Sequence, residues 1–266
     1  MKSFNNIHKE LIYSYNLGSR FLVFDGGEPT LWHDSGRDVN DLVVVAKKIG
    51  FFTCTIVTNG QHPLYSSKAD NIRVSLDGTQ KYHDDIRGDG TFAKIEKNIV
   101  DSDHPNITVK LTINTHNAVN VVDTIKYANT NPHIKQIYIG FHTPFPGTEY
   151  LALDWESRAR IIDTVIQMKR KGYPIMNSIS GLKRMKNMQF NKQCWMSNFI
   201  MYDGVKPSEC PGNRAGLCNE CGFSMAGEMH SIFNFRIDTF VTAARKLRML
   251  YPALKQRGGC PIGHPP

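Results

Sequence analysis

The chain has 266 residues, of which 41% are hydrophobic, so it is long enough to bury the core of one domain with an appendage. No apolar run approaches the ~18 residues that a membrane span needs, and residues 1–18 are polar and amphipathic, so we expect a cytoplasmic protein without a membrane partner. The 32 Lys and Arg residues exceed the 24 Asp and Glu residues, a net charge of +8. The basic clusters lie on helix-like segments without regular aromatic interleaving, so we expect solvated faces and no nucleic-acid partner. A basic balance also suits an anionic substrate or partner.

Strand-like and helix-like segments alternate along the first 186 residues. A helix is expected over 5–16, where apolar residues recur on one helical face, and Gly18 follows as a C-cap. The further expected elements, in chain order, are strand 20–24, helix 39–49, strand 53–58, strand 71–76, helix 92–101, strand 107–113, helix 119–129, strand 134–142, helix 155–171, a weaker strand 173–177 and a short helix near 182–187. The alternation predicts an α/β fold with a parallel sheet. The Val, Ile, Leu and Phe content of the strands predicts that they are covered on both faces.

The composition changes near residue 186. Residues 187–227 are rich in Cys, Gly, Asn and Met and show little periodicity. A final helix is expected over 237–250, and the tail 258–266 should be irregular. We therefore expect an α/β domain over 1–186, followed by a cysteine-rich extension and a C-terminal helix over 187–266.

Four of the six cysteines lie within 28 residues of this extension: Cys194, Cys210, Cys218 and Cys221. Clustered cysteines in an intracellular chain indicate metal or redox chemistry more than disulfides. Cys218 and Cys221 form a C-x2-C pair, a spacing that lets two thiolates bind one metal centre. Four cysteines suit a [4Fe–4S] cluster or a structural zinc site, and free thiols are a third interpretation. Cys54 lies inside a strand and is expected to be a small buried apolar residue, whereas Cys260 is an extra ligand or has no role.

The segment Gly26-Gly27-Glu28-Pro29 directly follows the expected strand 20–24. Paired glycines let the backbone pass close to a ligand, and the carboxyl ends of parallel strands are where α/β folds bind ligands. Taken alone, the segment also fits a plain β-turn in which Pro29 fixes one φ angle.

Comparable signals follow later strands: Val57-Thr58-Asn59-Gly60, Val74-Ser75-Leu76-Asp77-Gly78 with Arg87 beyond it, and Ile139-Gly140-Phe141-His142. Each alone fits an ordinary turn. Together with Gly26–Pro29, in this order, they resemble the core of the radical S-adenosylmethionine (SAM) superfamily over residues 5–177. The resemblance implies a partial (β/α)6 TIM-type barrel that cleaves SAM reductively and modifies a substrate by radical chemistry.

The resemblance also implies how the first loop binds SAM. The backbone carbonyls of Gly26 and Gly27 and the carboxylate of Glu28 would accept hydrogen bonds from the SAM amino group, and Pro29 belongs to the same loop.

Further strand ends would hold the rest of SAM. Ser75 and Arg87, the latter expected in the loop after the strand, would bind the SAM carboxylate, because an Arg–carboxylate pair is charge-assisted. Asn114 would face the ribose, and Gly140 and Phe141 would contact the adenine through their backbone. Two plainer interpretations stay open: Arg87 as a surface arginine and Asn114 as a turn or capping residue.

Members of this superfamily hold a [4Fe–4S] cluster on three cysteines spaced C-x3-C-x2-C, some tens of residues before the Gly-Gly-Glu-Pro segment. Here 25 residues precede Gly26 and none is cysteine, since the first is Cys54. We therefore expect a barrel without its first strand, and SAM bound without a SAM-coordinating cluster. Two interpretations follow: an N-terminally truncated enzyme that is inactive as written, or a non-catalytic Fe–S or zinc protein derived from the fold. An unrelated phosphate-binding α/β enzyme is a third interpretation, although no Gly-rich phosphate loop is apparent.

The cysteine segment resembles the auxiliary-cluster extensions of the same superfamily, which implies an auxiliary [4Fe–4S] cluster. Five residues separate Gly204 from Cys210, one more than the pattern of those extensions. The implied substrate is a peptide or a small molecule, and the implied electron donor is a flavodoxin or a ferredoxin.

Overall fold

The chain folds around a five-stranded parallel sheet that forms part of a TIM-like barrel. In the computed structural model, which describes residues 2–64 and 67–255, the strand order is β1(Phe21–Phe24), β4(Thr53–Thr58), β5(Asn71–Ser75), β6(Ile107–Ile113) and β7(Ile134–Phe141). All neighbouring pairs in this sheet are parallel. Ile175 adds an isolated parallel bridge to Ile137 beyond β7. Within the described part of the chain, β1 forms the opposite edge and pairs with β4 alone.

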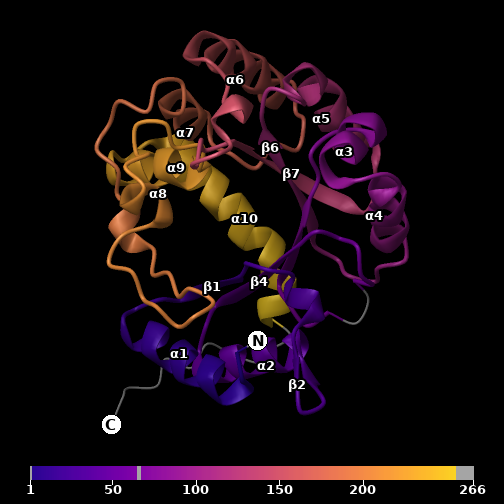
Figure 1. Cartoon of the computed structure of the whole chain (residues 1–266), viewed down its shortest axis with the longest axis vertical. Coiled ribbons are helices and arrows are strands. Elements are labelled where there is room, and N and C mark those ends of the chain that lie inside the picture. Colours follow the sequence, from indigo (N-terminus) through magenta and orange to yellow (C-terminus); the bar gives the residue numbers. More distant parts are fainter. Residues whose placement is uncertain (1, 65–66, 256–266) are drawn as a thin grey trace.

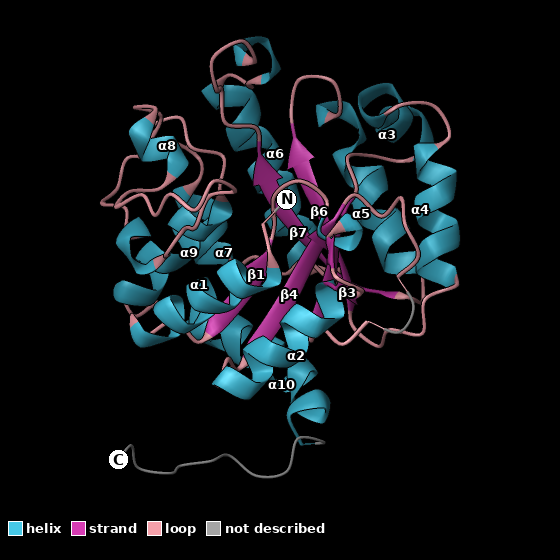
Figure 2. Ribbon diagram, turned by 60° about the horizontal axis from the view of Figure 1, so that its bottom comes forward, coloured by secondary structure: helices cyan, strands magenta, loops and turns pink. Residues whose placement is uncertain are grey.

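Helices surround this sheet, as Figures 1 and 2 show. They are α1(Phe4–Asn16), α2(Val39–Ile49), α3(Gln80–Arg87), α4(Thr91–Val100), α5(Val121–Thr130), α6(Trp155–Arg170), α7(Ile179–Arg184), α8(Pro211–Arg214), α9(Ser224–Phe233) and α10(Ile237–Lys255). A small hairpin of β2(His33–Asp34) and β3(Arg37–Asp38) precedes α2. None of the helices in the described segments is both long and apolar enough to cross a membrane.

The α/β fold and the parallel sheet expected from the sequence are confirmed, and the five main strands match within about one residue at each end. The weaker strand expected over 173–177 contributes only the bridge at Ile175. Helices α3 and α9 were not expected. Consequently the expected loop position of Arg87 is wrong, because Arg87 is the last residue of α3. The expected tail over 258–266, with Cys260, lies outside the described residues.

All six residues of β4 are buried, as expected for a strand covered on both faces, but the two faces of the sheet differ in polarity. Ile72 and Val74 of β5 and Val109 of β6 are buried in the core that the sheet shares with α4, α5 and α6. Since successive side chains of a strand point to opposite faces, the alternate residues form a second, polar face inside the partial barrel. We call this the inner face; it consists of Asn71, Arg73, Ser75, Thr108, Lys110, Thr112, Gln136, Tyr138 and Gly140.

A second, smaller core fixes the N-terminal helices to β4. Leu11 of α1 and Val43 of α2 pack with Phe51, Cys54 and Ile56. Cys54 is fully buried there, which confirms the expectation of a small apolar role.

The residues after 187 pack against the barrel through α9 and α10. The carboxylate of Glu228 on α9 accepts hydrogen bonds from the Ser178 backbone N–H at 2.8 Å and its hydroxyl at 2.6 Å. Asp238 on α10 accepts the same two bonds from Ser180, at 2.8 and 2.6 Å. These contacts join the C-terminal helices to the start of α7, and in Figure 1 α10 runs from α9 towards the centre of the molecule.

Candidate functional site

The sequence-predicted SAM residues come from the carboxyl ends of β1, β5, β6 and β7, or from the segments that follow them. Because these strands are parallel, their carboxyl ends lie at one edge of the sheet. The structure therefore brings the predicted residues to one end of the barrel, although their individual contacts differ from the expected ones.

Gly26 and Gly27 both have left-handed backbone conformations, with φ values of 88° and 59°. Such φ values are strained for residues with a Cβ, which explains glycine at both positions. A Cβ built on either residue would meet nothing within 4 Å. Both glycines are exposed, so the loop after β1 is open to solvent.

Glu28 makes hydrogen bonds that stabilise the loop, a role that the sequence did not predict. Its Oε1 accepts hydrogen bonds from the Thr30 N–H, the Thr30 hydroxyl and the Thr58 hydroxyl, at 3.1, 2.7 and 2.7 Å. Its Oε2 accepts from the Asn59 N–H at 2.7 Å. A carboxylate has about four acceptor sites, so these contacts use nearly all of its capacity. Glu28 ties the loop after β1 to the end of β4, and Pro29, which is buried, starts the short helical turn beside it.

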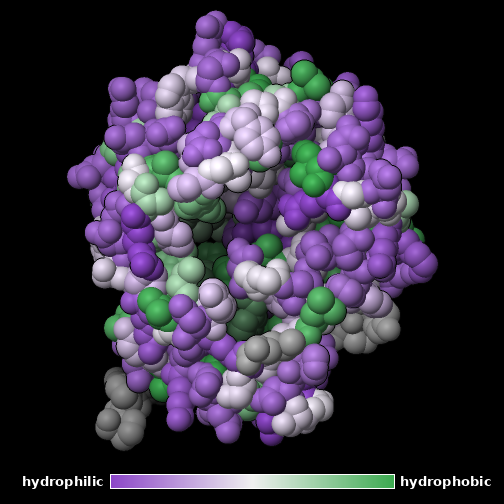
Figure 3. Space-filling model, viewed as in Figure 1, coloured by the Kyte–Doolittle hydropathy of each residue, from purple (hydrophilic) through white to green (hydrophobic). Residues whose placement is uncertain are grey.

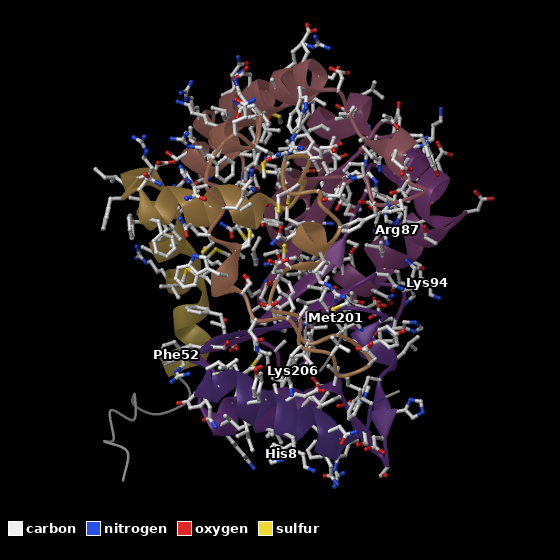
Figure 4. All side chains as sticks on the ribbon, turned by 60° about the vertical axis from the view of Figure 1, so that its left-hand side comes forward. His8, Phe52, Arg87, Lys94, Met201 and Lys206 are labelled. Carbon is white, nitrogen blue, oxygen red and sulfur yellow. The ribbon has the colours of Figure 1, made fainter. Side chains whose placement is uncertain are left out.

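Arg87 is anchored by an aspartate rather than free in a loop. Its Nε donates to Oδ2 of Asp77 at 2.6 Å, and Asp77 is buried at the end of β5. One guanidinium edge is therefore held by the protein, and an arginine carries further N–H donors on its terminal nitrogens. Ser75 lies two residues before Asp77 and is half-buried on the inner face. Figure 4 labels Arg87 together with Lys94 of the next helix, α4.

Asn114 shapes the turn after β6. Its Oδ1 accepts hydrogen bonds from the N–H groups of His116 and Asn117, at 2.9 and 3.2 Å. Its own N–H donates to Oδ1 of Asn117 at 2.8 Å. These contacts are those of a turn asparagine, the plainer of the two interpretations of this residue.

The end of β7 is covered by the chain itself. The Phe141 N–H donates to the Gly222 carbonyl at 2.9 Å, and the Gly222 N–H donates to the Thr143 hydroxyl at 2.9 Å. A Cβ on Gly222 would lie 1.8 Å from the Phe141 carbonyl oxygen, so only glycine fits so close. The Phe141 N–H that was expected near adenine is thus occupied, and Gly140 packs under Gly222 as well. The same contact fixes Cys221, the neighbour of Gly222, beside the end of β7.

The four cysteines of the extension are neighbours in space. Burial and the nearby thiols of Cys210, Cys221 and Cys218 raise the pKa of Cys194 to about 11. Burial likewise raises the pKa of Cys218 and of Cys221, with a further contribution from Cys210. In the part of the chain that the structure describes, none of the cysteines forms a disulfide.

Polar groups surround these sulfur atoms. The Asn213 N–H donates to Sγ of Cys210 and the Phe223 N–H to Sγ of Cys221, both at 3.4 Å. The Cys218 thiol donates to Oδ1 of Asn213 at 3.2 Å. In thiolate metal sites, backbone N–H groups commonly donate hydrogen bonds to the sulfur atoms that bind the metal.

The four thiols of this segment are the donor type that an Fe–S or zinc centre uses. Among the described residues, however, no three His, Cys, Asp or Glu side chains stand in an arrangement that would hold a metal ion. A bound metal would favour the thiolate forms and reverse the direction of the cysteine pKa shifts.

Arg158 is a residue of this region that the sequence did not single out. It is 4% exposed, and its guanidinium lies over the rings of Phe141 and Trp155, 4.6 and 4.9 Å from their centroids. Its Nη2 donates to the Cys221 carbonyl at 2.8 Å. Burial lowers the pKa of Arg158 to about 10, which leaves it charged at neutral pH. The sequence held no signal for this role, because nothing distinguishes Arg158 from the exposed Arg160 on the same helix.

The comparisons with known proteins identify no family. No protein-family model matches the chain, and no curated protein matches it. Among solved structures, the chain is similar to "Structure of TYW1 with a lysine-pyruvate adduct bound", with 16% sequence identity and a TM-score of 0.42. That match covers 60% of this chain and 59% of the length of the solved chain.

Proposed function

We propose that the chain has a radical SAM-type barrel that binds SAM at the carboxyl ends of its strands, beside a cysteine site for an auxiliary [4Fe–4S] cluster. The substrate is a peptide or a small molecule, and a flavodoxin or ferredoxin is the proposed electron donor. When bound, such clusters supply single electrons to the reaction.

The observation that carries this proposal is the contact between Phe141 and Gly222. It joins two features that lie far apart in the sequence, the strand-end loops and the cysteine segment. Because Gly222 follows Cys221 directly, the thiols lie at the same end of the sheet as Gly26, Gly27 and Arg87. An arrangement of this kind supports electron transfer or substrate binding next to SAM.

The proposal assigns each residue a physical task. The carbonyls of Gly26 and Gly27, in an exposed loop, accept from the SAM amino group. The terminal nitrogens of Arg87, oriented by Asp77, donate to the SAM carboxylate, assisted by the Ser75 hydroxyl. Glu28 acts indirectly, because it holds the loop against β4.

The remaining predicted residues have weaker support as direct contacts. Asn114 is proposed near the ribose only through the turn that it shapes. Gly140 and Phe141 are proposed to form the adenine side of the pocket through the shape of the strand end, because the Phe141 donor is occupied.

The cluster proposal is tested by anaerobic reconstitution with iron and sulfide. We expect about four irons per chain and a broad visible charge-transfer band, the stoichiometry and signature of a [4Fe–4S] centre. The double change Cys218→Ala and Cys221→Ala should abolish both, whereas Cys54→Ala, in the N-terminal core, should leave both unchanged. Zinc bound without iron in the wild-type chain would contradict the cluster proposal.

The same reconstituted protein should not form 5′-deoxyadenosine from SAM, because residues 1–266 contain no C-x3-C-x2-C sequence. Clear turnover would contradict this part of the proposal.

A non-catalytic metal-binding protein of the same fold is the second candidate. It is favoured by the contacts of Glu28 and of the Phe141 N–H, which the chain itself satisfies. If the four cysteines bind a metal but the protein has no affinity for SAM, this candidate is supported over the first.

A further inference from the structure

The inner face of the sheet carries half-buried cations that neither SAM nor the cysteine site uses. In the sheet register, Ser75 of β5 pairs with Lys110 of β6, and Lys110 pairs with Tyr138 of β7. Arg73 lies on the same face, two residues before Ser75, and pairs with Thr108. Figure 3 shows the molecule hollowed near its centre, with both hydrophilic and hydrophobic residues inside the hollow.

Arg73 is the first of these cations. Its guanidinium lies 5.0 Å from the centroid of the Tyr138 ring. Its Nε is buried and has no hydrogen-bond partner within the described residues. Native structures satisfy nearly all buried donors, so a buried N–H without a partner, on a half-buried cation, indicates a ligand or an ordered water.

Lys110 and Lys246 bring two further positive charges. Burial lowers the pKa of Lys110, and Asp25 partly opposes this effect while Arg73 adds to it. Burial and the repulsion from Arg73 lower the pKa of Lys246, on α10, to about 8. Lys246 also lines a small hollow of about 10 Å³ with polar residues at the starts of the strands, among them Asn71, Thr108 and Gln136.

The negative charges nearby do not balance this cluster. Asp25 faces both Arg73 and Lys110. Asp77 is engaged in its ion pair with Arg87. Glu228 faces Lys246, but burial raises the pKa of Glu228 to about 7 and so weakens its charge. Three cations thus face about one full negative charge, in a place where water screens poorly.

We propose that Arg73, Lys110 and Lys246 form a binding site for the oxyanion group of a small molecule, a carboxylate or a phosphate, inside the barrel. A guanidinium donor beside two ammonium groups matches the geometry and charge of such a group. Tyr138, whose ring packs against Arg73, lies on the same face. The site itself is independent of SAM; that its ligand is the substrate of the radical reaction rests on the proposed function.

Isothermal titration with inorganic phosphate and, separately, with succinate tests the site. We expect saturable binding of at least one of the two anions, and the preferred anion identifies the ligand group. Arg73→Gln and Lys110→Met should each weaken this binding about tenfold or more, the cost of one charge-assisted hydrogen bond. Lys94→Met, an exposed lysine on α4, should leave it unchanged, and Lys110→Arg should retain most of it.

In the titrations without SAM, two results would overturn the inference. One is the absence of saturable binding of both anions to the folded wild-type chain. The other is undiminished binding in Lys110→Met and Arg73→Gln, once urea unfolding has shown that both variants fold.

A titration in saturating SAM separates this inference from the proposed function. If the anion still binds in saturating SAM, the oxyanion site is separate from the SAM site. If SAM competes with the anion, the inference of a separate site is overturned, because the cations would then hold the carboxylate of SAM itself. If the protein binds no SAM, the proposed function fails, while the titration without SAM still decides whether the oxyanion site exists.

Discussion

Glu28 joins two strand ends with a single carboxylate. It accepts four hydrogen bonds, three of them at Oε1, and it connects the glycine loop after β1 to Thr58 and Asn59 after β4. The sequence predicted a polar residue at a ligand-binding loop. It did not predict that both carboxylate oxygens would accept hydrogen bonds from the protein itself. A partner 30 residues away in sequence cannot be read from a short motif.

Glu28→Gln should destabilise the fold by about 1–3 kcal/mol, because the amide group would place a donor against either the Asn59 N–H or the Thr30 N–H. Urea unfolding at pH 7 measures the change. Glu156→Gln, at an exposed i,i+4 pair with Arg160, is the matched control and should change stability by less than about 0.5 kcal/mol. Equal effects of the two changes would show that Glu28 does not hold the loop.

Glu228 gives the fold a specific dependence on pH. Burial raises its pKa from 4.5 to about 7, although Ser178 donates two hydrogen bonds to it. The folded state therefore holds this proton more tightly than the unfolded state does. Its contribution to stability is fully present below about pH 4.5 and is lost as the pH rises through about 7, a loss of up to about 3 kcal/mol.

Glu228→Gln should remove this loss, since the amide can accept from the Ser178 N–H and donate to its hydroxyl. The variant should gain stability relative to the wild type between pH 5 and pH 8, as measured by urea unfolding at several pH values. Glu156→Gln again serves as the control. A stability difference that stays constant over this range would contradict the assignment.

At the scale of elements, the segment around Gly222 acts as a short addition to the end of β7. It fixes the cysteine-bearing chain to the barrel through Phe141 and Thr143, while Arg158 of α6 binds the Cys221 carbonyl. This docking depends on the absence of a side chain at Gly222.

Gly222→Ala should therefore destabilise the protein by about 2–3 kcal/mol, through the clash with the Phe141 carbonyl and the loss of two hydrogen bonds. Hydrogen exchange should show faster exchange at the Phe141 amide. Gly212→Ala is the control, because a Cβ there meets no atom closer than 4.0 Å. Unchanged protection of Phe141 in Gly222→Ala would refute the docking.

The sequence predicted the main elements well where periodicity was strong. Strands β4 and β6 and helix α2 have the predicted bounds, because their hydrophobic patterns are long and regular. Helix α3 was missed because it is largely polar and begins with Gln80-Lys81, so that its helical form depends on packing of buried His83. The alternation of Arg73 with Ile72 and Val74, and of Lys110 with Val109 and Leu111, was visible in the sequence, and a two-residue period would have revealed the inner face.

At the scale of the whole molecule, the sequence predicted which strand ends would meet but not what each side chain would contact. Parallel topology alone brings Gly26, Ser75 and Asn114 to one edge. The contacts Asp77–Arg87 and Arg158–Cys221 depend on tertiary packing between elements that are distant in the chain, which no local pattern encodes. The placement of the cysteine segment beside β7 is of the same kind.

The most direct test of the central claim, that this edge of the barrel is a SAM-type site, is calorimetric titration of the anaerobically reconstituted chain with SAM. We predict saturable binding at one site. Arg87→Gln should weaken it about tenfold or more through loss of the carboxylate contact, and Lys94→Gln should have no effect. An absence of saturable binding to the folded protein, or equal binding by the Arg87→Gln variant, would contradict the account.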